Sequence, residues 1–76
     1  MKVKIYLKKK TKLSETPVKK TLTPYLKQIE YTHNIREADV EIDCEFINKD
    51  TIYFHKKDIV EKIEKAIQKK IKSPLS

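Results

Sequence analysis

In residues 39–47, DVEIDCEFI, acidic and apolar side chains alternate strictly from Asp39 to Phe46. Successive side chains of a strand point to opposite faces, so this stretch predicts a strand with one buried and one solvent-facing side. The side chains expected to be buried are those of Val40, Ile42, Cys44 and Phe46. Those expected to face solvent are Asp39, Glu41, Asp43 and Glu45.

The residues that follow this stretch predict a second strand. Asn48-Lys49-Asp50 is polar and typical of a turn, and residues 51–56, TIYFHK, alternate again. Two alternating runs joined by about three polar residues indicate a β-hairpin. In this hairpin Ile52 and Phe54 point inward, and Tyr53 and His55 point outward.

The N-terminal segment predicts a third strand. Residues 2–8, KVKIYLK, place Val3, Ile5 and Leu7 on one face and lysines and Tyr6 on the other. Residues 9–16 are polar and are expected to form a loop. If strands 2–8 and 39–47 are neighbours, outward lysines lie beside outward carboxylates, which favours their pairing.

The C-terminal segment predicts an amphipathic helix over residues 59–72. Isoleucines recur at helical spacing, Asp58 is placed as the N-cap with Glu61 three residues later, and Pro74 ends the helix. Its apolar stripe is expected to face the core.

The stretch between the first strand and residue 39 is the most ambiguous. Thr16-Pro17 and Thr23-Pro24 both match an N-cap followed by proline at the first helical position. We expect the main helix over residues 24–33, with Asn34 in a left-handed conformation after it. Residues 16–23 are compatible with helix, turn or strand.

Together these elements predict a small α+β domain over residues 1–73, with residues 74–76 as a short tail. The expected order is β-α-β-β-α. A crossover helix between parallel strands lies over the apolar face of the sheet. The predicted fold is therefore a two-layer sandwich, with a three-stranded sheet and both helices on one face.

Composition excludes several classes of protein. The chain has 76 residues, with equal hydrophobic and charged fractions of 38%. One cysteine excludes a disulfide framework, and the absence of glycine excludes a glycine-rich phosphate loop. No apolar run is long enough for a membrane span or a secretory signal, so we expect a cytoplasmic protein.

No motif in the chain indicates catalysis. Cys44 and His55 are expected on opposite faces of the hairpin, and the carboxylates lie on an open strand face. Cys44 has no base on its own face and is expected to be an ordinary buried thiol. We therefore expect no enzyme, no metal site and no cofactor.

The distribution of charge favours a binding function. The formal net charge is +7, and residues 1–27 contain nine lysines and one glutamate. We expect sequence-independent binding of DNA or RNA through phosphate contacts, because lysine supplies a point charge and the chain has a single arginine. The lysines expected to make these contacts are Lys8, Lys9, Lys10, Lys12, Lys19 and Lys20.

Two other surfaces are candidates for binding. Tyr6, Tyr53 and His55 are expected to share the outward face, where either they form a stacking platform for bases or the tyrosines cover the sheet and brace the lysine stems. The acidic stripe of Glu41, Asp43 and Glu45, together with the exposed hairpin edge at residues 51–56, favours instead a protein-interaction module. Such a module would be a small regulator, an inhibitor or a homo-oligomer, and the sequence leaves the oligomeric state open.

Overall fold

The computed structural model describes residues 2–71 and contains a three-stranded parallel sheet with two α-helices. Strand β1 spans Val3–Lys8, β2 spans Ile29–Tyr31 and β3 spans Val40–Asp43. Helix α1 spans Lys12–Thr21 and α2 spans Ile52–Ile71. Two short 3-10 helices complete the order, η1 at Thr23–Tyr25 and η2 at Ile35–Glu37. No helix in this part of the chain is both long and apolar enough to cross a bilayer.

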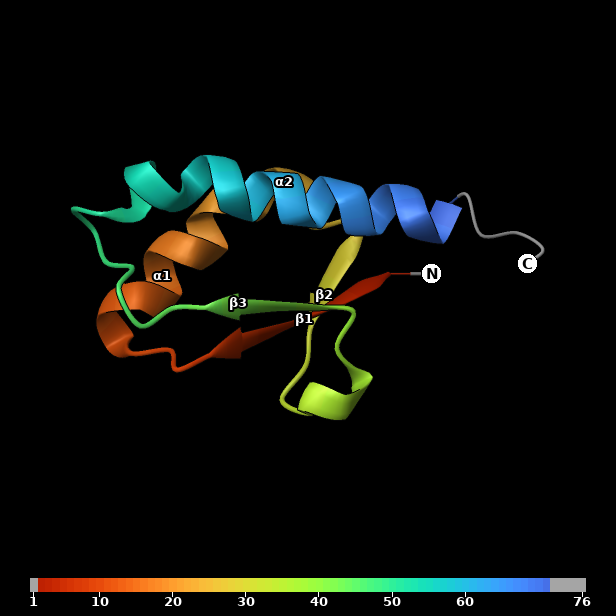
Figure 1. The fold of residues 1–76 in the computed structure, drawn as a ribbon, viewed down its shortest axis with the longest axis horizontal. Coiled ribbons are helices and arrows are strands. Elements are labelled where there is room, and N and C mark those ends of the chain that lie inside the picture. The colour runs from red at the N-terminus through yellow and green to blue at the C-terminus, as the bar shows by residue number, and fades with distance from the viewer. Residues whose placement is uncertain (1, 72–76) are drawn as a thin grey trace.

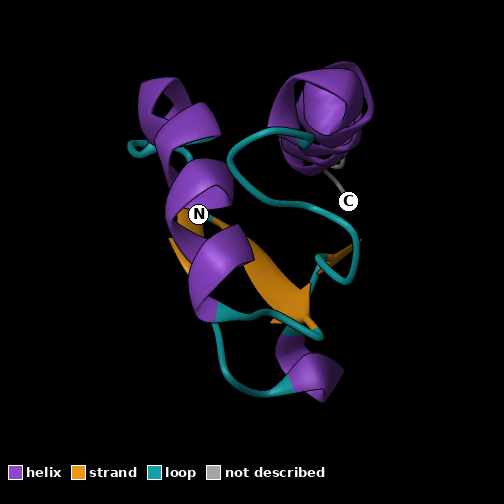
Figure 2. Ribbon diagram, turned by 90° about the vertical axis from the view of Figure 1, so that its left-hand side faces the viewer, coloured by secondary structure: helices purple, strands orange, loops and turns teal. Residues whose placement is uncertain are grey.

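The strands lie in the order β2-β1-β3, so β1 is central. The segment with α1 carries the chain from β1 to β2, and the segment with η2 carries it back across β1 to β3. Right-handed crossovers that run in opposite directions lie on opposite faces of a sheet. Figure 1 shows this arrangement, with α1 and α2 on one side of the sheet and η2 on the other. Figure 2 shows the same layers end on. The predicted α+β class, with three strands in one sheet and two α-helices, is confirmed, and the arrangement of the layers is consistent with the predicted sandwich.

The core lies between the sheet and the two α-helices. Its buried apolar side chains are Val3, Ile5, Leu7, Val18, Leu22, Ile29, Ile42, Cys44, Ile47, Ile59 and Ile63. The alternation in residues 2–8 and 39–44 therefore predicts the buried face correctly. Phe46 is the exception, because the strand ends at Asp43 and the Phe46 side chain is exposed.

The predicted pairing of residues 2–8 with residues 39–47 is also confirmed. In the parallel register Lys8 lies opposite Asp43 and Tyr6 opposite Glu41, while Lys4 lies opposite Glu30 of β2. These residues alternate with the buried ones, so the face away from the helices carries opposite charges on neighbouring strands. Cross-strand pairs of opposite charge stabilise a sheet.

Helix α1 begins earlier than the sequence pattern suggests. Residues 9–16 were expected to form a loop, but α1 starts at Lys12. Thr11 is the N-cap: its hydroxyl accepts from the Ser14 N–H, and the Ser14 hydroxyl accepts from the Thr11 N–H at 2.8 Å. This reciprocal pair replaces the Glu or Gln that usually marks a capping box. Pro17 lies inside α1 and does not begin it.

The predicted helix over residues 24–33 is wrong. Pro24 lies in the short helix η1, and residues 29–31 form β2. Pairing with β1 buries Ile29 against the core, which outweighs the weak helical spacing of this segment. Asn34 is not left-handed; its φ is −107°, and its side chain accepts from the Arg36 N–H as the N-cap of η2.

The predicted hairpin is wrong as well, because residues 52–56 are the first turns of α2. The Asn48 carbonyl accepts from the Ile52 N–H, and its side-chain oxygen accepts from the N–H groups of Asp50 and Thr51. Asn48 thus caps a helix where a hairpin turn was expected. Asp58, expected as the N-cap, lies within α2. Pro74 and residues 74–76 lie outside the described residues.

Candidate functional site

The loop between β1 and α1 is rich in lysine, but carboxylates neutralise much of its charge. Lys9 Nζ lies 3.2 Å from Glu45 Oε2, and Lys10 Nζ lies 3.0 Å from Glu15 Oε2. Lys19 Nζ also approaches Glu15, at 3.8 Å. The hydrogen bond and charge of Lys10 lower the pKa of Glu15, so this carboxylate stays ionised beside the loop.

Among the six predicted lysines, two differ from the rest. Lys8, Lys12 and Lys20 form no ion pair with a carboxylate of residues 2–71, and of these three only Lys8 lies opposite an acidic residue, Asp43, in the sheet. Lys12, Thr16 and Lys20 follow one another at four-residue spacing, which places them along one face of α1. That face borders a hollow of the described surface through Thr16 and Lys20.

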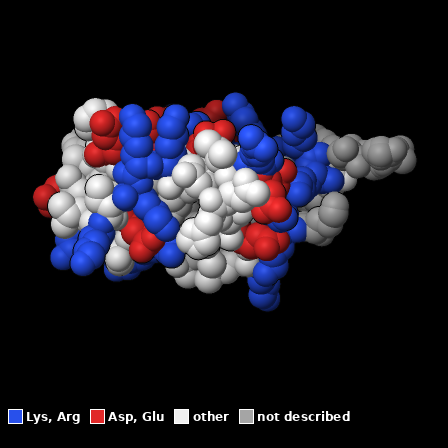
Figure 3. Space-filling view, turned by 90° about the horizontal axis from the view of Figure 1, so that it is seen from below, with Lys and Arg blue, Asp and Glu red and all other residues white. Residues whose placement is uncertain are grey.

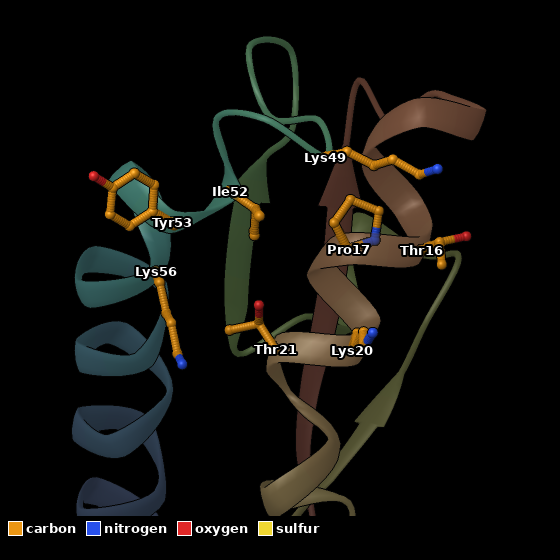
Figure 4. Close-up of a pocket in the computed structure, with 8 residues that line it drawn as sticks. All are labelled: Thr16, Pro17, Lys20, Thr21, Lys49, Ile52, Tyr53 and Lys56. Carbon is orange, nitrogen blue, oxygen red and sulfur yellow. The ribbon is translucent and has the colours of Figure 1, made fainter.

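This hollow is a groove of about 600 Å³ between α1 and the start of α2. Its lining residues are Thr16, Pro17, Lys20, Thr21, Lys49, Ile52, Tyr53 and Lys56. Three of them are lysines and none is acidic. Figure 4 shows Lys49 extending from the loop before α2 toward the first half of α1, above Thr16 and Pro17, and Lys56 on the side of α2 that faces α1.

The three groove lysines come from separate segments, and all are exposed. Lys20 is in the second half of α1, Lys49 is in the turn that Asn48 and Thr51 hold in place, and Lys56 is in α2. None of them forms an ion pair with a carboxylate in residues 2–71. We call Lys20, Lys49 and Lys56 the groove lysines. Their charges are uncompensated at short range, so the groove is suited to an anionic ligand.

One aromatic side chain, that of Tyr53, lines the groove, and the ring of Phe54 lies next to it on α2. Tyr53 is 72% exposed and Phe54 is 69% exposed, and their ring centroids are 4.5 Å apart. Figure 4 shows the Tyr53 ring at the rim, with its hydroxyl directed away from α1. Large aromatic surfaces are normally buried, and here two adjacent rings remain open beside three lysines.

The predicted stacking platform of Tyr6, Tyr53 and His55 does not exist. Tyr6 is half-buried on β1, where it lies opposite Glu41 on the face away from the α-helices. Tyr53 and His55 belong to α2, in the other layer. His55 borders a small pocket with Asp43 and Asp58. The correction follows from the helical conformation of residues 52–56, which removes the alternation that grouped these side chains.

The acidic residues Glu41, Asp43 and Glu45 are exposed, as predicted. Glu45 is engaged by Lys9, and Asp43 lies opposite Lys8. Figure 3, seen from the side of the sheet that carries η2, shows basic and acidic side chains interspersed. This face therefore presents mixed charge, in contrast to the groove.

Cys44 is the free cysteine of the chain and lies in the core. Burial raises the pKa of the Cys44 thiol, which is buried in the core and stays protonated at neutral pH. Within residues 2–71, no three His, Cys, Asp or Glu side chains gather in a geometry that would hold a metal ion.

Sequence reasoning missed Lys49 and Lys56 as partners of Lys20. The available signal was Asn48 followed three residues later by Thr51, which allows a helix start before TIYFHK. A helix start there would have placed Ile52 and Lys56 at four-residue spacing and Tyr53 in the first turn.

Comparisons of the chain with protein-family models, with curated proteins and with solved structures give no match. The chemistry of the groove itself is therefore the basis for assigning a function.

Proposed function

We propose that this protein is a non-catalytic nucleic-acid-binding protein and that the groove lysines contact the phosphates. The observation that carries the proposal is the meeting of Lys20, Lys49 and Lys56 around one groove with no acidic lining residue. Lysine ammonium groups on flexible stems suit phosphate oxygens, which repeat along any nucleic acid.

The residue types at the groove favour binding without sequence specificity. Specific reading of base edges usually employs arginine, asparagine or glutamine in fixed geometry. The groove lining contains none of these, and the single arginine, Arg36, lies in η2 on the opposite side of the sheet. Affinity from lysine–phosphate contacts falls steeply as salt rises, because binding releases condensed counterions.

Fluorescence anisotropy of a labelled oligonucleotide, at about 50 and 200 mM salt, tests the proposal. The variant Lys20→Gln/Lys49→Gln/Lys56→Gln removes the groove lysines. It is expected to weaken binding at least about tenfold and to reduce the salt slope by about 2.

The matched control is Lys62→Gln/Lys65→Gln/Lys69→Gln, which removes the same charge from exposed positions of α2 beside the edge of β3. It is expected to retain most of the affinity. Equal losses in both triple variants would contradict a role for the groove, and no binding at low salt would contradict the function.

The position of β3 supports a second candidate, a protein-interaction module. Strand β3 is at an edge of the sheet and, within the described residues, pairs only with β1. An open strand edge can accept a strand from another chain. Light scattering over a range of concentrations tests this candidate: a concentration-dependent dimer supports pairing through β3, and a monomer at every concentration excludes self-pairing.

A further inference from the structure

The aromatic pair of Tyr53, which lines the groove, and its neighbour Phe54 lies outside the hydrophobic core. Helix α2 directs Ile59 and Ile63 into the core, and both are buried. Tyr53 and Phe54 remain about two-thirds exposed or more. Their rings contact each other at 4.5 Å and leave most of their surface to solvent. Most of the surface of both rings is therefore accessible to a ligand.

The position of the two rings indicates which class of ligand they would bind. Tyr53 lines the same groove as the three lysines, so a ligand held there meets positive charge and an aromatic ring together. Nucleic acid offers phosphates for the lysines and flat bases for the rings. In a duplex the faces of the bases are covered by their neighbours, whereas bases of a single strand are free to stack on protein aromatics.

The volume of the groove is consistent with a single strand as the ligand. A volume of about 600 Å³ is within the range of pockets that enclose small organic ligands. Such a space accommodates a short stretch of single strand with an unstacked base. A duplex, by comparison, would rest on the lysines at the surface and leave the aromatic rings without partners.

We infer that the groove selects single-stranded nucleic acid, with the groove lysines on the phosphates and Tyr53 and Phe54 stacked against bases. This inference rests on the proposed nucleic-acid function and adds the class of ligand. The groove combines lysines that attract phosphates with an exposed aromatic ring. Single-stranded nucleic acid is the polyanion that can interact with both, through its phosphates and its unstacked bases.

The test compares a labelled single strand of about twelve nucleotides with a duplex of the same length, by fluorescence anisotropy. The single strand is expected to bind at least about tenfold more tightly than the duplex. The variant Tyr53→Ala/Phe54→Ala is expected to lose about tenfold in single-strand affinity, in line with the stacking contribution of one base.

Two controls separate stacking from folding. Tyr53→Phe/Phe54→Tyr keeps both rings and is expected to retain the single-strand affinity. Ile35→Ala removes a different exposed apolar side chain, located on the η2 side of the sheet, and is expected to bind as the parent does. Thermal melting of each variant verifies that it is folded.

The outcomes distinguish the inference from the function on which it rests. Equal affinity for single strand and duplex, or full single-strand affinity in Tyr53→Ala/Phe54→Ala, would overturn the inference and leave the proposed function standing. Failure to bind either nucleic acid would overturn both, and binding of vesicles containing phosphatidylserine in its place would assign the groove to a membrane surface.

Discussion

Lys9 has a φ of 54° and is the one non-glycine residue with positive φ within residues 2–71. The left-handed conformation costs about 1–2 kcal/mol for a residue with a Cβ. Glycine avoids this cost but loses about 0.5–1 kcal/mol of backbone entropy on folding. The exposed ion pair with Glu45 contributes little. We therefore expect Lys9→Gly to raise the free energy of unfolding by about 0.5 kcal/mol.

Urea denaturation measures this change, and Lys10→Gly is its matched control. Lys10 does not have positive φ, so glycine there is expected to lower the free energy of unfolding by about 0.5–1 kcal/mol. Destabilisation of similar size in both variants would contradict the left-handed conformation of Lys9.

Asp39 links the first residues of the sheet to the end of α2. Its Oδ2 accepts from the Lys4 N–H at 2.8 Å and lies 3.0 Å from Lys70 Nζ. Partial burial by itself raises the pKa of Asp39, but these two donors lower it below its ordinary value of 3.8. The ionised carboxylate therefore stabilises the fold above that value, and this contribution is lost as the pH falls through the lowered pKa.

We expect Asp39→Asn to lower the free energy of unfolding at neutral pH by about 0.5–1 kcal/mol, since the pair is partly exposed. The difference from the parent protein is expected to shrink as the pH falls below 3.8. Urea denaturation across this pH range measures it. A difference that is constant with pH would show that the charge of Asp39 has no part in stability.

At the scale of elements, the first turns of α2 distinguish the observed helix from the hairpin that the pattern indicates. Phe54 is 69% exposed on the helix, whereas the hairpin would bury it. We expect Phe54→Ala to change the free energy of unfolding by less than about 0.5 kcal/mol. Truncation of a buried phenylalanine to alanine would instead lower the free energy of unfolding by about 3–5 kcal/mol.

Chemical denaturation of this variant is compared with Ile63→Ala, which truncates a fully buried side chain of the same helix. The isoleucine variant is expected to lose about 2–5 kcal/mol. A loss of that size in Phe54→Ala would mean that the Phe54 side chain is buried in the core, as the hairpin requires.

The elements that the sequence predicts correctly are those in which the pattern of apolar residues matches the side chains that are buried in the structure. Strict alternation in residues 2–8 and 39–43 predicts β1 and β3, their pairing and their buried face. Isoleucine spacing predicts α2 from Ile59 onward. The α+β class follows from these segments, although the third strand of the sheet is residues 29–31 and not the expected residues 51–56.

The remaining elements depend on contacts that the sequence does not reveal. Strand β2 has only three residues, and its pairing with β1 decides its conformation. In TIYFHK, β-branched and aromatic residues favour a strand, and the Asn48 cap and the packing of the whole helix override that preference. The candidate groove was not predictable for the same reason, because it exists only if α2 begins at residue 52.

At the scale of the whole molecule, positive charge is concentrated by the fold and not only by the sequence. The lysine-rich first third of the chain is partly neutralised by Glu15, Glu45 and the acidic face of β3. The turn before α2 instead brings Lys49 and Lys56 beside Lys20, where the lining has no carboxylate. The fold thus creates one uncompensated basic groove, which is the central claim of the proposed function.

The most direct test of this claim is to follow the backbone amide resonances of the protein while an unlabelled single-stranded oligonucleotide is added. The largest shifts are expected in residues 16–21 and 48–56, which form the two walls of the groove. Strand β3 and helix η2 are expected to shift little. Shifts centred on residues 35–43, or no shifts at low salt, would contradict the account.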